Sequence, residues 1–385
     1  MTNGGRKNVD LSNASLQVVL DRLEGSIPRL MKAATVPGLS ITLIRSGDIA
    51  WSRAFGVRNR GTDEPVTPDT LFEAASLSKP LFAYASLSLC ARGVLDLDTP
   101  LVEYVPDRRI SITLPTANSE TERIKLDVPQ LERVTARHVL SHTTGFPNWP
   151  PKEGPLKLHF VPGERFSYSG MAYSALQAVV EAITGQTAEQ YVQADVLEPL
   201  GMVNSRFVWT GQEDLPVALG HDKDGQPREK SLWPEMIAGA SLHGTSQDFA
   251  RFMLTATQPT PTDRFQLSSS LAKEMLTSQV QVNDSFPWHE DWPKSEINLS
   301  EQVGWGLGWG IQHTVEGTSF WHWGDNAGYK HFAVGSRQEG FGIVIMTNGE
   351  NGQDVYRRIL YESIGGEYPG LDWLISTCVT PGEVA

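Results

Sequence analysis

The sequence contains very little cysteine. Two of its 385 residues are cysteines, Cys90 and Cys378, and they lie far apart. Two distant cysteines provide neither a disulfide framework nor a cysteine-based metal site. The chain also lacks a run of about 20 apolar residues, the length that a helix needs to cross a bilayer. We therefore expect no membrane-spanning segment.

The first 15 residues lack the apolar core of a secretory signal. Together with the scarcity of cysteine, this predicts a cytoplasmic protein for the sequence as written. A periplasmic or secreted location is the alternative if an export signal was trimmed from the chain.

Positive charge is scarce as well. The 32 lysines and arginines face 45 aspartates and glutamates, which gives a net charge of −13, and no run of basic residues is present. Binding to phosphates requires clustered Lys and Arg. We therefore exclude nucleic acids and anionic membrane surfaces as partners and expect a small-molecule substrate. The sequence indicates no oligomeric state.

The patterning of apolar residues divides the chain into three parts. Short alternating or apolar runs with glycine turns, typical of antiparallel strands, occur at 39–45, 49–57, 304–313, 319–323, 330–336 and 341–348. Helical spacing occurs near both ends, at 14–34 with an interruption near Gly25 and Pro28, and at 352–364. The middle is mostly helical, with helical patterns at 76–92, 135–143 and 172–194.

These patterns predict an α/β (α+β) fold. An antiparallel sheet is built from both ends of the chain and flanked by terminal helices, and a mostly helical domain is inserted into it. The predicted boundaries are 1–72 plus 245–385 for the sheet domain and 73–244 for the inserted domain. A length of 385 residues suits two domains, or one domain with a large insertion.

The strongest candidate for chemistry is the pair Ser76 and Lys79. Residues i and i+3 share one face of a helix, so Lys79 is expected to point at the Ser76 hydroxyl. A partly desolvated lysine can lose its proton near neutrality and accept one from serine. The S-x-x-K spacing alone is a weak pattern, and on spacing alone a plain helix start is the better explanation. It recurs at Ser270 and Lys273, which we interpret as a solvated helix face.

Two further segments could complete such a site. Tyr168 has a phenol whose pKa a neighbouring ammonium would lower, which would let the pair shuttle protons; a core tyrosine is the alternative. His322, Trp323 and Gly324 end a strand-like run, where glycine allows a backbone to approach a substrate closely. The backbone N–H of Asp325, with that of Ser76, would form an oxyanion hole. A strand end with a packed aromatic residue is the alternative interpretation.

Three other patterns do not support competing sites. His138 and His142 have the spacing of a helical metal pair, but the glutamate of the hydrolytic zinc motif and a third ligand are missing. The glycines of 304–310 fall on every second position, which fits a strand with one smooth face and no phosphate loop. The chain has no G-x-S-x-G motif, which argues against an α/β-hydrolase. We therefore predict no metal and no cofactor.

Taken together and in this order, the motifs resemble the serine β-lactamase-like superfamily. That group includes class C β-lactamases, D-Ala-D-Ala carboxypeptidases, D-aminopeptidases and family VIII carboxylesterases. The matching segments span nearly the whole chain: VPGLSITLIRSGDIAWSRAFG (36–56), TLFEAASLSKP (70–80), GVLDLDTPLVEYVP (93–106), TARHVLSHTTGFP (135–147), PGERFSYSG (162–170), VLEPLGMVNSRF (196–207), GWGLGWG (304–310), FWHWGDNAGY (320–329) and IVIMTNGENG (343–352).

The resemblance implies a role for each motif. Ser76 is the acylated nucleophile, Lys79 its partner and Tyr168 the proton shuttle of the second motif. His322 to Gly324 form the third motif, K-T-G or H-x-G in relatives, after which the Asp325 backbone helps to hold the oxyanion. In this scheme HTTGFP supports the site, and His142 is a packing residue.

Departures from the family pattern bear on the substrate. Many relatives have Tyr-x-Asn in the second motif, whereas Gly170 stands at the third position here. His322 replaces a lysine and is mostly neutral at pH 7, so it would hold a substrate carboxylate less firmly. Trp323 is expected to crowd the acyl site with an aromatic face. These changes favour neutral esters over penicillins or D-Ala-D-Ala termini.

We therefore predict a metal-free serine hydrolase, a carboxylesterase acting on short-chain acyl esters through an acyl-enzyme. The alternatives are a β-lactamase, D-aminopeptidase or D-Ala-D-Ala carboxypeptidase with the same mechanism, or a non-catalytic binding protein on this fold. A tryptophan cluster at 288–323 is expected near the site, with one member as a wall of an acyl pocket and the others as sheet packing. Its members are Trp288, Trp292, Trp305, Trp309, Trp321 and Trp323.

Overall fold

The computed structural model describes residues 16–116, 120–151, 154–212, 214–257, 267–282 and 301–377. Its α-helices are α1 (Leu16–Ala33), α2 (Ser78–Ala91), α3 (Ala136–Leu140), α4 (Gly170–Thr184), α5 (Ala188–Val192), α6 (Ser246–Thr257), α7 (Ser269–Met275), α8 (Gly352–Arg358) and α9 (Pro369–Thr377). Its strands are β1 (Gly38–Arg45), β2 (Asp48–Asn59), β3 (Glu64–Pro65), β4 (Phe72–Ala75), β5 (Ser111–Pro115), β6 (Thr121–Lys125), β7 (Leu242–Gly244), β8 (Val280–Gln281), β9 (Val303–Trp305), β10 (Gly310–Thr314), β11 (Gly317–Asn326), β12 (Tyr329–Ser336) and β13 (Phe341–Thr347).

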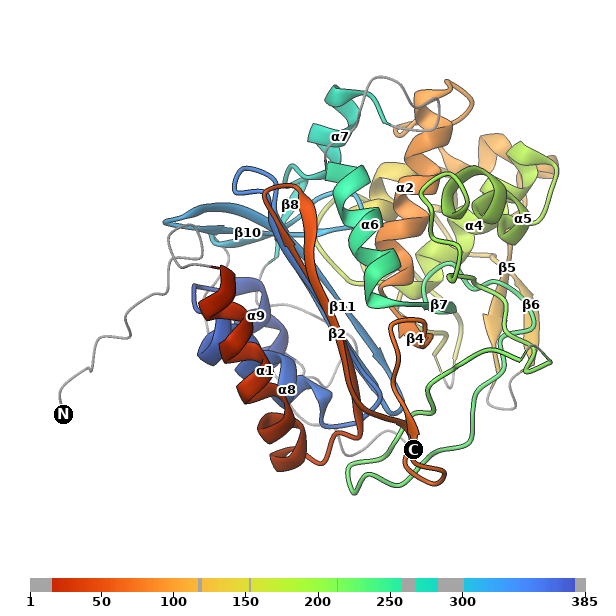
Figure 1. Cartoon of the computed structure of the whole chain (residues 1–385). Coiled ribbons are helices and arrows are strands. Elements are labelled where there is room, and N and C mark those ends of the chain that lie inside the picture. Colours follow the sequence, from red (N-terminus) through yellow and green to blue (C-terminus); the bar gives the residue numbers. More distant parts are fainter. Residues whose placement is uncertain are drawn as a thin grey trace.

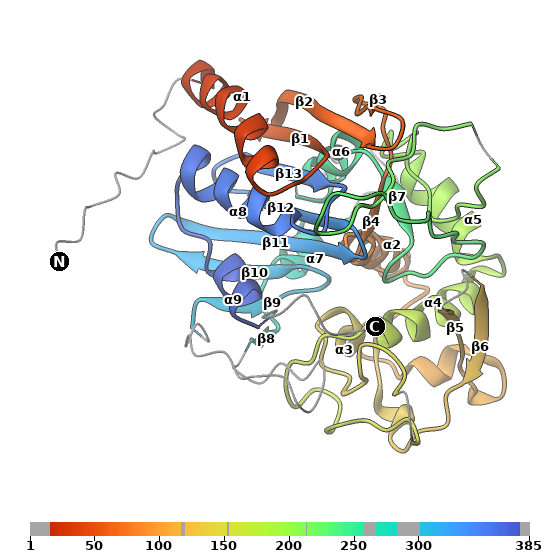
Figure 2. The ribbon, with the colours of Figure 1, turned by 90° about the horizontal axis from the view of Figure 1, so that it is seen from below.

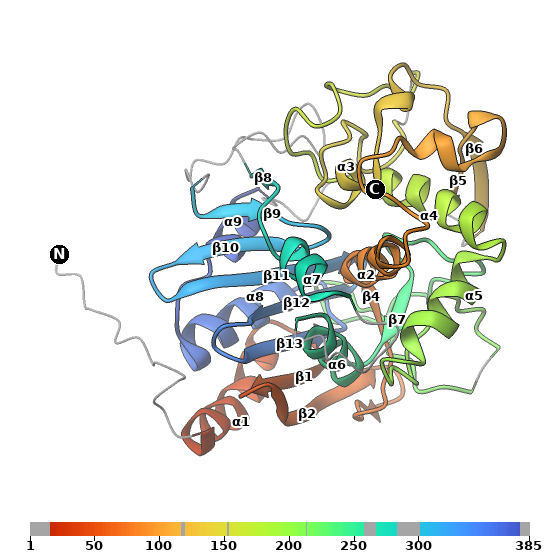
Figure 3. The ribbon, with the colours of Figure 1, turned by 90° about the horizontal axis from the view of Figure 1, so that it is seen from above.

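One nine-stranded sheet forms the centre of the described structure (Figure 3). Its strands follow the spatial order β3-β2-β1-β13-β12-β11-β10-β9-β8, and every neighbouring pair is antiparallel. β1 from the start of the chain pairs with β13 from its end, with Leu39 opposite Thr347 and Ile44 opposite Gly342. The predicted antiparallel sheet built from both ends of the chain is therefore confirmed.

Helices cover both faces of this sheet (Figure 1). α1, α8 and α9 lie against one face, and α2 and α6 lie on the other (Figure 2). Successive side chains of a strand point to opposite faces of the sheet, so each face has its own set of apolar side chains for these helices to cover. Leu39, Ile41 and Leu43 of β1 share one buried apolar cluster with Val19 and Leu23 of α1. The mixed fold class predicted from the sequence is confirmed.

The middle of the chain lies beside the sheet rather than within it. α3, α4, α5 and the small β5–β6 sheet are grouped at one side of the molecule (Figure 2). β4 pairs with β7, with Phe72 opposite Gly244, so the two ends of segment 73–244 lie next to each other. The division into two domains at these ends stays a prediction. Within the described part of the chain, no helix combines the length and apolarity that a membrane crossing needs.

The first helix is continuous, against the expectation of an interruption near Gly25 and Pro28. α1 runs from Leu16 to Ala33 with Pro28 inside it. Proline removes one helical hydrogen bond, but the helix buries an apolar stripe that includes Ile27 and Leu30 against the sheet. That tertiary burial outweighs the local preference.

Two other expectations need correction at the C-terminal end. The run 304–310 is two strands and a turn, because Gly306 N–H donates to the Trp309 carbonyl at 2.8 Å and Trp305 pairs with Gly310. The helical pattern at 352–364 does not close the fold, since α9 follows it and packs on β9 and β10. Pro369 at the start of α9 is a sequence signal for a helix N-terminus.

Candidate active site

Ser76 lies in a tight turn between β4 and α2. The preceding residue, Ala75, has a positive φ of 52°, which is uncommon for any residue but glycine. This conformation turns the chain out of β4, and Leu77 N–H donates to the Ala74 carbonyl at 3.1 Å. α2 begins two residues later, at Ser78, and Ser76 itself is partly exposed. The turn thus leaves the Ser76 hydroxyl accessible at the start of the helix.

The Lys79 ammonium reaches the Ser76 hydroxyl. Lys79 Nζ lies 3.0 Å from Ser76 Oγ and donates to the Gly239 carbonyl at 2.8 Å. The side chain is 2% exposed, and burial lowers its pKa to about 7. A lysine with this pKa is neutral in a large fraction of molecules near pH 7, so it can accept a proton from Ser76.

Tyr168 is held over Lys79 by His142. Lys79 Nζ lies 4.7 Å from the centre of the Tyr168 ring. The centre of the His142 ring lies 4.3 Å from that of the Tyr168 ring, and the two ring planes are tilted by 33°. The His142 carbonyl accepts from Ser167 N–H at 2.7 Å, and His142 Nδ1 accepts from Ser169 N–H at 3.0 Å. His142 therefore fixes the backbone on both sides of Tyr168, a larger role than the packing expected for it.

The third motif meets the Ser76 turn through Gly324. A Cβ at Gly324 would lie 2.3 Å from the Ala74 carbonyl oxygen, so no side chain fits there without moving one of the two strands. Asp325 follows on β11, and its carboxylate accepts from Lys330 Nζ at 2.7 Å. Gly324 thus brings the Asp325 backbone near the turn that carries Ser76.

His322 is buried and neutral. Its side chain is fully buried, and burial, followed by the charge of Lys79, lowers its pKa to about 3. Its Nδ1 and the Trp323 carbonyl are 2.7 Å apart, which places the ring proton on Nδ1 as the donor. His322 therefore contributes no positive charge to the site near pH 7.

Comparison with known proteins identifies the family of the chain. A family model described as Beta-lactamase matches residues 23–365. The chain belongs to the beta-lactamase family. The roles of Ser76, Lys79 and Tyr168 stay a prediction.

Individual relatives are more distant. The esterase EstB of Burkholderia gladioli is 32% identical over 235 residues, and this chain spans 55% of that relative's length, with 54% of this chain matched. A class C beta-lactamase structure superposes with a TM-score of 0.71 at 18% identity, covering 92% of this chain and 99% of that one. A penicillin-binding protein homologue from Pyrococcus abyssi gives 0.69 at 24% identity, covering 89% and 76%. The two structures show the shared fold.

Trp323, which was expected to crowd the acyl site, is buried like the other described tryptophans of the cluster. Trp323 is 2% exposed, and its ring packs on Tyr168 at 4.7 Å and on His322 at 5.0 Å. The Trp323 ring therefore packs against the Tyr168 ring. Successive side chains of a strand point to opposite faces, so Trp323 points away from the face of β11 on which Gly324 meets Ala74. Trp309 and Trp321 are fully buried in sheet packing, and Trp305 is fully buried with its ring against those of His142 and Tyr168. Trp288 and Trp292 lie outside the described residues.

The histidine pair His138 and His142 does not converge on a common point. His138 Nδ1 accepts from Thr135 N–H at the start of α3, while His142 bonds to the Tyr168 segment. Across the ranges that the structure describes, no three His, Cys, Asp or Glu side chains are grouped as metal ligands. The second S-x-x-K lies on α7 with Ser270 and Lys273 exposed, as interpreted from the sequence.

Sequence reasoning missed two residues of the site. Gly239 contributes a main-chain carbonyl to Lys79, and no sequence signal marks such a contact because every residue has a carbonyl. Asn148 accepts from Gly170 N–H through Oδ1 at 2.8 Å. Its position directly after the HTTGFP segment was the available signal.

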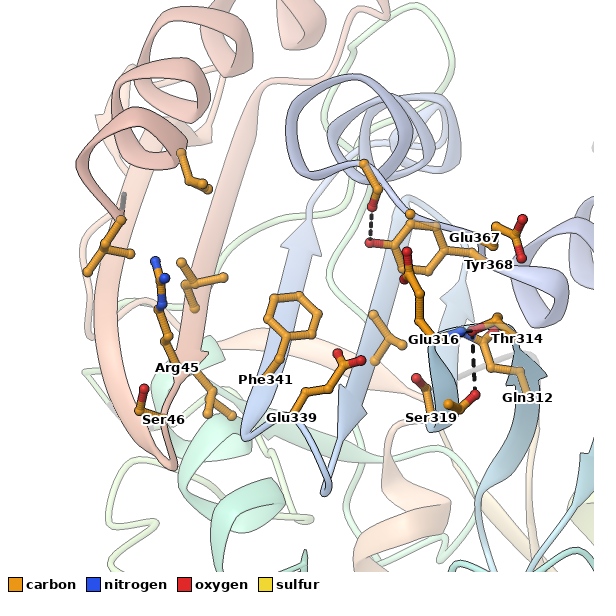
Figure 4. A pocket seen from close by; sticks show the side chains of 18 residues that line it. Arg45, Ser46, Gln312, Thr314, Glu316, Ser319, Glu339, Phe341, Glu367 and Tyr368 are labelled. Atoms are coloured by element: carbon orange, nitrogen blue, oxygen red, sulfur yellow. Dashed lines mark hydrogen bonds between the residues drawn. The ribbon is translucent and has the colours of Figure 1, made fainter. Parts of the chain in front are cut away.

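A separate hollow lies at the opposite end of the sheet (Figure 4). Its volume is about 660 Å³, and the carboxylates of Glu316, Glu339 and Glu367 border it. Gly317, where β11 begins, lines this hollow, whereas Gly324 near the other end of β11 contacts the Ser76 turn. Seven strand residues correspond to roughly 20 Å, so the hollow is distinct from the candidate active site.

Proposed function

We propose that the protein is a serine hydrolase that works through an acyl-enzyme, with short-chain acyl esters as substrates. The observation that carries this proposal is the contact between Lys79 Nζ and Ser76 Oγ at 3.0 Å, made by a buried lysine with a pKa of about 7. A neutral amine at this distance can act as the general base for the serine hydroxyl.

The proposed reaction has two halves. Ser76 attacks the ester carbonyl while Lys79 and Tyr168 take its proton and pass it to the departing alcohol. The backbone N–H groups of Ser76 and Asp325 stabilise the oxyanion. Water, activated by Tyr168, then releases the acid from Ser76 and restores the enzyme.

The electrostatics of the site support a neutral ester as the substrate. His322 stays uncharged at pH 7 because burial lowers its pKa to about 3. It therefore offers no positive charge to the carboxylate of a penicillin or of a D-Ala-D-Ala terminus. The similarity to an esterase of Burkholderia gladioli supports the same choice.

Ester hydrolysis by the purified protein tests the proposal. We expect turnover of p-nitrophenyl acetate and butyrate, and loss of that turnover in Ser76→Ala, whose folding is checked by circular dichroism. Activity retained in a folded Ser76→Ala protein would show that Ser76 is not the nucleophile. Nitrocefin turnover exceeding ester turnover would assign the site to lactams. Absence of labelling by a fluorophosphonate probe would favour a binding protein.

A further inference from the structure

Asn148 fills the space that a side chain at position 170 would occupy. A Cβ added to Gly170 would lie 3.0 Å from the Asn148 main-chain oxygen and 3.2 Å from its Oδ1. Contacts this short leave no room for a residue larger than glycine unless Asn148 moves. An asparagine from the loop between α3 and α4 therefore packs against the glycine at the third position of the second motif, where a side chain would otherwise lie.

The Asn148 carboxamide is held in one orientation. Its Oδ1 accepts from Gly170 N–H at 2.8 Å, and its main-chain oxygen accepts from Met171 N–H at 3.1 Å. The residue is 6% exposed. With Oδ1 engaged, the two N–H donors on Nδ2 remain, and they have no partner among the described residues. Nδ2 is not among the fully buried atoms that lack a partner, so it reaches solvent, and a ligand oxygen can replace the water that it binds.

This donor lies at the edge of the candidate active site. A Cβ at Gly239 would lie 3.2 Å from Lys79 Nζ and 3.6 Å from Gly170 Cα, so the space for one side-chain atom at Gly239 is bordered by both the lysine and Gly170. Asn148 is bonded to the N–H of the same Gly170. The indole of Trp149 is 43% exposed and lies 3.8 Å from the same Cβ position at Gly170. A polar donor and an apolar face thus adjoin the reacting pair.

We infer that Asn148 donates a hydrogen bond from Nδ2 to an acceptor oxygen of the substrate outside the scissile ester, and that Trp149 covers the neighbouring apolar atoms. The preferred substrates are esters with a carbonyl or ether oxygen a few bonds from the ester group. This inference rests on the proposed esterase function. The oxygen can belong to the acyl chain or to the alcohol, and the experiment separates these two cases.

Two pairs of matched esters provide the assay. The acyl pair is p-nitrophenyl 4-oxopentanoate and p-nitrophenyl pentanoate; the alcohol pair is 2-methoxyethyl acetate and butyl acetate. The measured quantity is the kcat/KM of the ester with the additional oxygen divided by that of its hydrocarbon counterpart. This ratio cancels differences in the active fraction between preparations. We expect Asn148→Ala and Asn148→Asp to lower this ratio about 3- to 10-fold in one pair, as for loss of one neutral hydrogen bond.

Asn59→Asp is the matched control. Asn59 Oδ1 accepts from Gly61 N–H at 2.8 Å, as Asn148 Oδ1 does from Gly170, but it lies on β2 near the edge of the sheet. The substitution adds the same charge and keeps the same kind of acceptor, so the wild-type ratio should be retained.

Unchanged ratios in both Asn148 variants and both pairs would overturn the inference while leaving the esterase function in place. An equal fall of the ratio in Asn59→Asp would overturn it as well, because net charge would then explain the effect. Absence of hydrolysis of all four esters by the wild type would overturn the proposed function and this inference with it.

Discussion

Replacing Lys79 by methionine should stabilise the protein more at acidic pH than at alkaline pH. The ordinary pKa of a lysine is 10.5, and burial lowers that of Lys79 to about 7. Between these two values the unfolded chain holds a proton on Lys79 that the folded chain has lost. The wild type therefore gains stability as the pH rises through this window, and the full penalty of burying the charge applies below pH 7.

The size of the effect follows from the same two values. Each pH unit between 7 and 10.5 changes the free energy of unfolding of the wild type by about 1.4 kcal/mol. Lys79→Met removes the titrating group, so its advantage over the wild type should be about 3 kcal/mol larger at pH 6 than at pH 9. The hydrogen bonds to Ser76 and Gly239 are stronger for the ammonium than for the amine, and this difference is already contained in the pKa of about 7.

Urea unfolding followed by the fluorescence of the 11 tryptophans measures these free energies at each pH. Ser86→Ala is the control, because it removes a buried hydroxyl of the same helix, bonded to the Phe82 carbonyl, without touching Lys79 or removing a titrating group, and its effect should be equal at pH 6 and pH 9. A Lys79→Met effect that does not vary with pH would refute the reasoning. Lys79 would then have the same pKa in the folded and unfolded chain.

Three further predictions concern catalysis. The value of kcat/KM for esters should rise with pH with an apparent pKa near 7, as Lys79 loses its proton, and a flat profile between pH 6 and 8 would contradict this. His142→Phe retains a ring against Tyr168 but loses the acceptor for Ser169 N–H, whereas His142→Asn retains an acceptor. We expect kcat to fall by up to about 100-fold in His142→Phe and by less in His142→Asn. The reverse order would disprove the role given to Nδ1. Gly324→Ala should lower kcat by about 100-fold because its Cβ would push β11 away from the Ser76 turn, whereas Gly25→Ala, where a Cβ meets nothing within 4 Å, should leave kcat unchanged.

Local patterns predicted most of the fold. Alternating apolar residues at 39–45 and 341–348 predicted strands at both ends of the chain, and these strands pair directly. Prediction failed where tertiary contacts override local preference. α1 continues through Pro28 because its apolar stripe is buried, and the glycine-rich run at 304–310 bends into a hairpin that its alternation did not reveal.

The candidate site was predictable to the extent that it depends on spacing. Ser76 and Lys79 are three residues apart at a helix start, and the structure brings their side chains to 3.0 Å. The burial of Trp323 was not predictable, because its sequence position is the same whether its ring borders a substrate or packs beneath Tyr168. The side of the sheet to which each strand residue points decides between these two outcomes.

The sequence by itself determined that Ser76 and Lys79 stand three residues apart at the start of a helix, a spacing that allows their side chains to meet. Tertiary structure alone decided what these groups can do. The pKa of Lys79 falls to about 7 because distant segments exclude water from it. Asn148 comes to fill the space at Gly170 through a loop 22 residues away in the chain. Desolvation and close packing depend on all neighbours in space, and a motif records only the neighbours along the chain.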